Sequence, residues 1–332
     1  MERNTVEMKK YEMVKENDMY RIIALRDFGN VKKGDKGGLV YHNFNLSHSG
    51  TCWIGYNATV RDNAMVLDNA IVEGEAIIRD NAKVFDKALV EGDAIVRGNA
   101  QVRGNAIVGG NALVEDNAIL HEHADVYDNA RVSNYAVVRG YAKVYGNAEI
   151  RDKAIIYDNA KVFDEALVEG NSNVCGYARV HGNAIVRGDA VVCDDAIIRG
   201  NALICDNAIV RVEGVIHDDA TVFGNARVYG NAIIRGNAVV RDDALADGNA
   251  ILEGNALLES NARVLHGTHT NKVQYIKGSD YTATVDGDYI NIKNNSYTPD
   301  EWLMVIDEWD MDSDKKAEYK GIVLFLKNTY MV

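Results

Sequence analysis

The chain has 332 residues, with 36 Lys and Arg against 49 Asp and Glu, and a formal net charge of −13. This acidic balance argues against a nucleic-acid partner, because phosphate binding relies on Lys and Arg. No apolar run approaches the roughly 18 residues that span a bilayer, and the first residues lack the apolar segment of a secretory signal. We therefore expect no membrane association and a cytoplasmic location. The 29 Gly accompany a single Pro, which indicates a regular repeat.

Residues 1–50 are predicted to form an N-terminal segment and cap. Residues 1–18, rich in Glu, Lys and Met, are expected to form a short helix or to be disordered. The stretch that follows contains IALRDF, a glycine-rich KGDKGG at residues 33–38, LSHSG and CWI. Such a segment can cover the first coil of a repeat array, whose strand edges would otherwise be open for pairing with another chain.

Residues 51–267 consist of six-residue units that align without a gap. Each unit reads x-[N/D]-A-x-[V/I/L]-x, and the small position recurs every sixth residue from Ala58 to Ala262, 35 units in all. Ser172 and Gly214 replace the Ala, and Ala246 replaces the aliphatic residue. A short fixed period predicts a solenoid in which each unit contacts only its neighbours.

The spacing within a unit predicts a short strand followed by a corner. Residues two apart in a strand face the same way, so the Ala and the aliphatic residue of A-x-V point inward. Gly, Asn and Asp at the next positions tolerate the left-handed backbone conformation of a corner. Three consecutive units, each with one strand and one corner, make one triangular coil. About 12 such coils are expected, stacked as parallel rungs at about 4.8 Å.

An aliphatic residue followed four positions later by a small one, as in Val108 and Ala112 or Val186 and Ala190, resembles the hexapeptide-repeat proteins. That resemblance implies an all-β solenoid, a left-handed parallel β-helix. KGDKGG, LSHSG and CWI are similar to the entry segment of the YdcK-like family, a bacterial family described as transferase-like. The fold class also implies a homo-oligomer, with a homotrimer favoured.

Residues 268–332 are predicted to form a small α+β module. The Asp-Gly pair at 286–287 separates two alternating runs, which indicates a β-hairpin. TPDE at residues 298–301 is a capping box with Pro at the first helical position, and it predicts a helix through EWLMVIDEW. A second helix is expected over KKAEYKGIVLFLKN. The module resembles those found behind hexad repeats in phage and prophage proteins, which implies a distal cap or an oligomerisation element.

Positions three units apart stack in rows on the outside of such coils. The row proposed for ligand binding consists of Tyr127, Tyr145, Phe163, His181, Arg199, His217 and Arg235. Two interpretations stay open for its aromatic part: a binding platform, or like-on-like stacking that stabilises the rungs by itself. A second row contains Cys175 and Cys193, which are close enough in principle for a disulfide. Stacked free thiols are expected there, because cytosolic proteins rarely keep disulfides.

Outward positions within the strands are less polar than a free surface requires. One face carries Ile71, Leu89, Ile107, Ile197, Val215, Ile233 and Ile251, and the next carries Leu167, Ile185 and Leu203. Extended aliphatic rows usually mark interaction surfaces, although β-propensity on a rod that tolerates exposed Ile is an alternative. We expect these rows to be buried against another subunit of a symmetric oligomer or against the terminal segments.

Catalysis by the acyltransferases of this fold class uses a His general base beside a loop that leaves the coils, in a sheltered cleft. No insertion interrupts the hexads. The remaining catalytic candidates are His121, His123, His181 and His217. His181 and His217 have the 36-residue spacing of two zinc ligands in the γ-class carbonic anhydrases, but the third ligand position holds Val222. Because that site needs three nitrogen donors, we expect no metal site.

These patterns favour a non-catalytic β-helical scaffold or binding protein that acts through its outer faces or through grooves between subunits. Enzyme activity stays open, and the alternative function is an acyl-CoA-dependent acyltransferase. A second alternative is sequestration of a small anionic metabolite or nucleotide by the Arg and His rows. No cofactor is expected unless the acyltransferase alternative holds.

Overall fold

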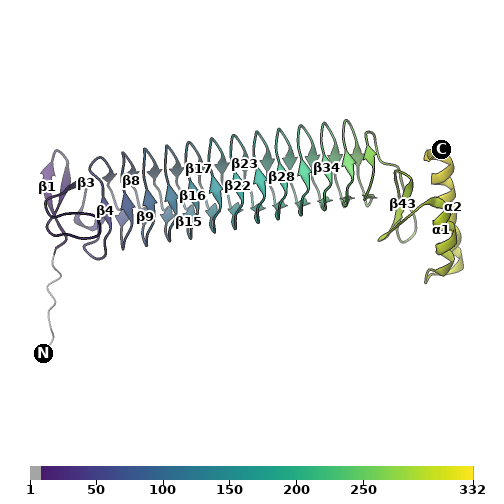
Figure 1. Cartoon of the computed structure of the whole chain (residues 1–332), viewed down its shortest axis with the longest axis horizontal. Helices are drawn as coiled ribbons and strands as arrows, with labels where there is room; N and C mark the ends of the chain where they lie inside the picture. The colour runs from purple at the N-terminus through teal and green to yellow at the C-terminus, as the bar shows by residue number, and fades with distance from the viewer. Residues whose placement is uncertain (1–8, 332) are drawn as a thin grey trace, which may run out of the picture. The chain divides into compact units, whose positions relative to one another are not determined.

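A computed structural model of the chain describes residues 9–331. The chain forms two compact units, unit 1 (Met1–Gly170) and unit 2 (Asn171–Val332). Both consist largely of parallel β-solenoid, about 13 coils of roughly 18 residues in all, and unit 2 ends in a small module of strands and helices (Figure 1). The predicted solenoid class is therefore confirmed.

Unit 1 begins with three strands that precede the hexads. β1 (Tyr11–Glu16) pairs antiparallel with β2 (Met19–Ala24), and β2 pairs antiparallel with β3 (Lys36–Val40). β3 also pairs in parallel with β5 (Thr59–Val60), which is a strand of the hexads. The N-terminal segment therefore extends one sheet of the solenoid.

The expectation of a short helix or disorder over residues 1–18 is wrong for its described part. Tyr11 is only 2% exposed, and its hydroxyl donates to the carbonyl of Leu46 at 2.7 Å. Pairing with β2 and this contact decide the conformation, and neither can be read from local composition. Residues 1–8 of this expectation lie outside the described residues.

Two buried polar side chains cover the first coils. Lys10 is fully buried, and its ammonium donates to the carbonyl of Cys52 at 2.9 Å and contacts the Cys52 sulfur at 3.1 Å. Burial lowers the pKa of Lys10 and raises the pKa of the Cys52 thiol. In η1 (Asn43–Asn45), the Asn45 amide donates to the carbonyl of Ala64 at 2.7 Å. These side chains thus satisfy carbonyls at the start of the solenoid.

The solenoid strands of unit 1 are two residues long and recur every sixth residue, from β4 (Trp53–Ile54) to β23 (Leu167–Val168). Each pairs in parallel with the corresponding strand of the next coil, as β10 (Leu89–Val90) does with β13 (Ile107–Val108). The second residue of each solenoid strand and the small residue two positions before it are fully buried, as Val90 and Ala88 show. The A-x-V pattern therefore builds the core as predicted.

Corners of the coils place Asp or Gly in the left-handed region. Asp80 has a φ of 60° and Gly98, one coil later, a φ of 68°. The Asp80 carboxylate also accepts a hydrogen bond from the backbone N–H of Gly98 at 3.0 Å. Asn side chains after the corners form a second ladder, in which the Asn63 amide donates to Asn81 at 3.2 Å. The predicted corner chemistry is confirmed, and the hydrogen bonds between coils add to it.

Unit 2 repeats this design from β24 (Asn173–Val174) to β39 (Arg263–Val264), followed by β40 (Thr268–His269). The three exceptions in its hexads fit the same core, and Gly214 is buried in place of Ala. Ser172 and Ala246 are both fully buried, in place of Ala and of a larger aliphatic residue.

The C-terminal module packs two helices against an antiparallel sheet. The sheet strands are β41 (Tyr275–Lys277), β42 (Thr282–Asp286), β43 (Tyr289–Ile292) and β44 (Asn295–Tyr297), and the helices are α1 (Pro299–Val305), η2 (Ile306–Glu308) and α2 (Ser313–Tyr330). The predicted hairpin is β42–β43, and the capping box from Thr298 to Glu301 is present. Trp302 and Tyr319, both fully buried, belong to its separate core.

β39 is the last strand of its sheet, so one of its edges has no neighbouring strand. Side chains of β42 cover that edge. The backbone N–H of Arg263 donates to the Thr284 hydroxyl at 3.0 Å. The backbone N–H groups of Leu265 and His266 donate to one oxygen of Asp286 at 2.6 and 3.0 Å. Because these donors would otherwise form an open strand edge, the module acts as the C-terminal cap of the coils in unit 2.

Candidate functional site

The aromatic part of the proposed binding row lies in unit 1 and forms a regular stack. The ring centroids of Tyr127 and Tyr145 are 5.0 Å apart, and those of Tyr145 and Phe163 are 4.9 Å apart, with the planes within 1° in both pairs. Tyr145 therefore has a ring against each of its faces, so a planar ligand cannot stack on it. This geometry favours the interpretation that the row stabilises the rungs.

The remaining residues of the row lie in unit 2 and follow successive strands of one sheet. They are His181, Arg199, His217 and Arg235. His217 Nδ1 lies 3.0 Å from the carboxylate of Asp218, and this contact lowers the pKa of Asp218. Arg235 Nε donates to Glu253 at 2.7 Å. The structure thus collects cationic and imidazole groups in one row, two of which already hold a carboxylate.

A polar cavity of about 310 Å³ lies in unit 2 between the last coils and the C-terminal module. Its lining includes Arg227, Arg263, Lys277, Lys293, Asp243 and Asp280. The Arg263 guanidinium donates to the carbonyl of Lys293 at 3.2 Å and to Asn294 at 3.0 Å. Lys315 pairs with Asp280 at 2.7 Å, so the cationic side chains of the lining outnumber the carboxylates that are not paired with Lys315.

The sequence patterns did not reveal this cavity, because its lining comes from the hexads and from a hairpin that begins well beyond them. The signal that could have indicated it is the presence of charged side chains on the outer face of the last hexads. Arg227 and Arg263 occupy outward strand positions at which aliphatic residues are frequent.

The four histidines proposed as catalytic do not line this cavity. His121 Nδ1 lies 3.5 Å from the Glu122 carboxylate, and burial lowers the pKa of His121. The ring of His123 stacks on Tyr141 with centroids 4.6 Å apart. Because a general base needs its acceptor within hydrogen-bond reach, the contacts of His121 and His123 with protein groups favour a structural role for both.

Ion pairs between adjacent coils occupy several arginines of the outer rows. Glu115 is 3% exposed, and its two oxygens accept from Arg97 Nε at 2.6 Å and from Arg131 Nε at 2.7 Å. The sequence patterns did not identify these ion pairs. The missed signal is the opposite charge one coil later, at Glu115.

Replacing Glu115 with Gln is expected to lower the free energy of unfolding of unit 1 by about 1–2 kcal/mol, because two guanidinium groups lose a shared carboxylate. Thermal denaturation followed by circular dichroism measures the loss. The matched variant Glu165→Gln, at an exposed corner, should change stability by less than about 0.5 kcal/mol. Equal melting temperatures for the two variants would show that the ion pairs of Glu115 contribute nothing to the stability of unit 1.

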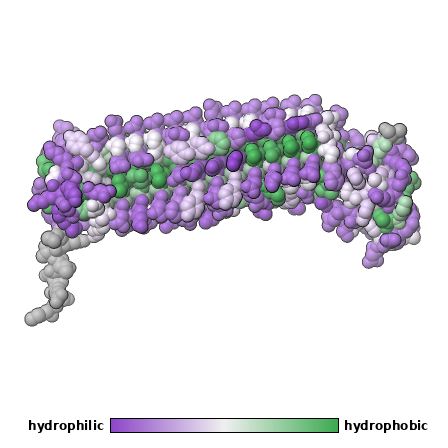
Figure 2. Space-filling view, in the orientation of Figure 1, coloured by the Kyte–Doolittle hydropathy of each residue, from purple (hydrophilic) through white to green (hydrophobic). Residues whose placement is uncertain are grey.

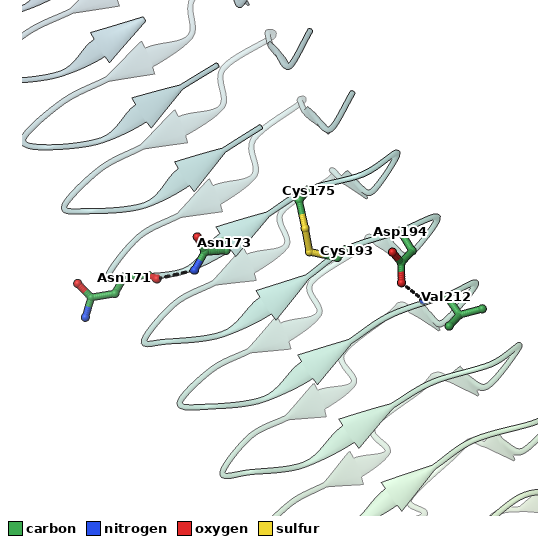
Figure 3. Close-up of a disulfide and its surroundings, with 6 residues drawn as sticks. All are labelled: Asn171, Asn173, Cys175, Cys193, Asp194 and Val212. Carbon is green, nitrogen blue, oxygen red and sulfur yellow. Dashed lines mark hydrogen bonds between the residues drawn. A yellow bond between two sulfur atoms is a disulfide. The ribbon is translucent and has the colours of Figure 1, made fainter. Parts of the chain in front are cut away.

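Cys175 and Cys193 form a disulfide between adjacent coils of unit 2 (Figure 3). The expectation of stacked free thiols is therefore wrong. Parallel rungs bring the two Cα atoms to 4.5 Å, which lies within the range that a disulfide accepts. One coil later along the chain, the Asp194 carboxylate accepts from the backbone N–H of Val212 at 3.1 Å, so covalent and hydrogen-bonded links between coils lie close together.

No helix among residues 9–331 combines the length and apolar character needed to cross a membrane. In the same part of the chain, no group of three or more His, Cys, Asp or Glu side chains is arranged to hold a metal ion.

The family model of the YdcK beta solenoid repeat matches residues 124–140 in unit 1 and residues 226–242 in unit 2. The match confirms the predicted resemblance to YdcK-like proteins, although it lies in the hexads and not in the entry segment from which that resemblance was predicted, and it names no function. No curated protein matches the chain.

Proposed function

We propose that this chain, a β-solenoid protein with YdcK-type repeats, is a non-catalytic binding scaffold that works through its outer faces as a homo-oligomer. The observation that carries the proposal is the presence of half-exposed aliphatic side chains on consecutive rungs. Ile71, Leu89 and Ile107 form one row in unit 1, and Ile197, Val215, Ile233 and Ile251 form another in unit 2. Figure 2 shows hydrophobic side chains gathered along the coils of each unit and bordered by hydrophilic ones.

Rows of this kind support binding because the coils hold them rigidly. The inward neighbours Val72, Val90 and Val108 are fully buried, and backbone hydrogen bonds join each rung to the next. Little conformational entropy is lost when such a surface meets a partner. Contiguous exposed apolar surface is also a recognised mark of interaction sites.

Site-specific photo-crosslinking tests the proposal directly. A benzophenone amino acid at Ile233 should give covalent adducts with a partner or a second copy after irradiation. The same group at Thr221, an outward position on a different sheet of unit 2, should give few. Equal adduct yields at the two positions would contradict the proposal. Calorimetric binding of acetyl-CoA would instead support the acyltransferase alternative.

Sequestration of a small anion is a second candidate function, favoured by the cationic cavity beside Arg227 and Arg263. Citrate is expected to raise the melting temperature of the protein in a saturable way, because it neutralises the excess of cations. The variant Arg227→Gln should lose this shift, whereas Arg211→Gln, an exposed Arg elsewhere in unit 2, should retain it. A shift that both variants retain would place anion binding elsewhere.

A further inference from the structure

We propose that the aliphatic row of unit 1 docks on the aliphatic row of unit 2 from a second copy of the chain, with the two sets of coils running in opposite directions. The inference rests on the proposed function and names the partner. The unit 1 surface is defined by Ile71, Leu89 and Ile107 with the outward residues on either side of them. The unit 2 surface is defined in the same way by Ile197, Val215 and Ile233.

The unit 1 surface has an acidic border on one side. Residues two apart along a strand share a face, so Glu73 follows Ile71 and Glu91 follows Leu89 on the outside. Glu73 is exposed and Glu91 is half-buried. Within the described residues, neither carboxylate has an ion pair, in contrast to Glu115. Two like charges one rung apart are unfavourable, and a cationic partner would relieve them.

The opposite border of the unit 1 surface carries a cation. Lys87 precedes Leu89 by two residues and is exposed. Its ammonium has no ion pair within the part of the chain that the structure describes. The surface is therefore an apolar row with carboxylates along one side and an ammonium along the other.

The unit 2 surface has the complementary borders. Arg235 follows Ile233 and His217 follows Val215, on the side that corresponds to Glu73 and Glu91. Glu213 precedes Val215 by two residues, on the side that corresponds to Lys87, and it is exposed. Arg235 already binds Glu253 at 2.7 Å, but a guanidinium has five N–H donors and can bind a second carboxylate.

Antiparallel docking brings these groups together. Both surfaces repeat at the same rung spacing of about 4.8 Å, so each rung meets one rung of the partner. Pairing Leu89 with Val215 also places Ile71 on Ile233. It sets Glu73 opposite Arg235, Glu91 opposite His217 and Lys87 opposite Glu213.

Parallel docking opposes like charges instead. For the coils of the two copies to run in the same direction, one surface must be turned within the plane of the interface. This turn exchanges the positions of its two borders. With the apolar rows still in contact, Glu73 then meets Glu213 and Lys87 meets Arg235. Since like-charge juxtaposition across an interface costs several kcal/mol, the charges select the antiparallel arrangement.

Charge exchange at Lys87 and Glu213 tests this arrangement, because both side chains are exposed and neither has an ion pair in the described chain. Sedimentation equilibrium of the full-length protein should show self-association. Lys87→Glu alone and Glu213→Lys alone should each raise the dissociation constant about tenfold. The double variant with both changes should recover most of the wild-type affinity.

A second pair of variants controls for stability. Leu89→Lys should abolish association, whereas Leu113→Lys, at an outward half-buried position on another sheet of unit 1, should leave it intact, and both should show the circular dichroism of the folded protein. A monomeric wild type, or a trimer whose mass is unaffected by the charge exchange, would overturn this docking. The binding-scaffold proposal would survive either result if Ile233 still gave crosslinks to another protein.

Discussion

Replacing Asp286 with Ala is expected to release the C-terminal module from the coils of unit 2. Asp286 is fully buried, and its carboxylate accepts from the backbone N–H groups of Leu265 and His266 and from the Asn291 amide at 2.7 Å. Alanine removes the acceptor of both backbone N–H groups, whereas the Asn291 amide keeps its hydrogen bond to the carbonyl of Arg263. A hydrogen bond to a charged group contributes about 1.5–3 kcal/mol, so the loss of two such bonds should cost on the order of 3–5 kcal/mol.

Hydrogen exchange detects this release, because the amides of Arg263, Leu265 and His266 should lose protection while those of the earlier coils keep theirs. Limited proteolysis should also cut the chain between the coils and the module. Asp288→Ala removes an exposed carboxylate two residues away and should leave both measurements unchanged. If the Leu265 amide stayed protected in the Asp286 variant, Asp286 would not be the residue that holds the module on the coils.

A methyl group at Gly38 is expected to disrupt the N-terminal cap. A Cβ atom there would lie under 3.0 Å from both the carbonyl oxygen of Ala58 and Cγ2 of Ile54. Backbone oxygens cannot move aside without breaking the pairing of β3 with β5. We therefore expect Gly38→Ala to lower the free energy of unfolding by about 3 kcal/mol, at the upper end of overpacking effects.

Gly321→Ala is the matched control, because the added methyl group in α2 has no atom within 4 Å apart from its chain neighbours and the backbone of its own helix. It should raise stability by about 0.5–1 kcal/mol through helix propensity. Thermal denaturation compares the two variants, and hydrogen exchange in β1 to β3 locates the loss. A Gly38 variant as stable as the wild type would mean that β3 does not pack on the hexads as described.

Most of the fold follows from the hexads, because the period alone sets which residues face inward and where the chain turns. A-x-V identifies buried pairs such as Ala88 and Val90, and the corner residues identify left-handed positions such as Asp80. The capping box could be predicted in the same way, because Thr298 and Glu301 are only three residues apart. Each of these features depends on residues within a few positions of one another, so sequence reasoning recovers them.

The candidate sites were harder to predict, because they depend on residues brought together across coils. The aromatic row was recognised from its spacing of one coil, but the stacking of Tyr145 between two rings appears only when the rungs are placed. The shared carboxylate of Glu115 also required the geometry of three successive rungs. The cavity beside Arg263 needed both the last coils and the module.

The sequence by itself determined the repeat, the inward and outward faces and the residues that stack in rows, since a fixed six-residue period leaves few alternatives. The tertiary structure alone decided how the coils end and which stacked side chains form hydrogen bonds, ion pairs or a disulfide. Tyr11 lies in a strand because β2 is available to pair with it, and Cys175 reaches Cys193 because their coils are adjacent. Local propensity is weak at chain ends and between rungs, so contacts with distant residues decide the outcome there.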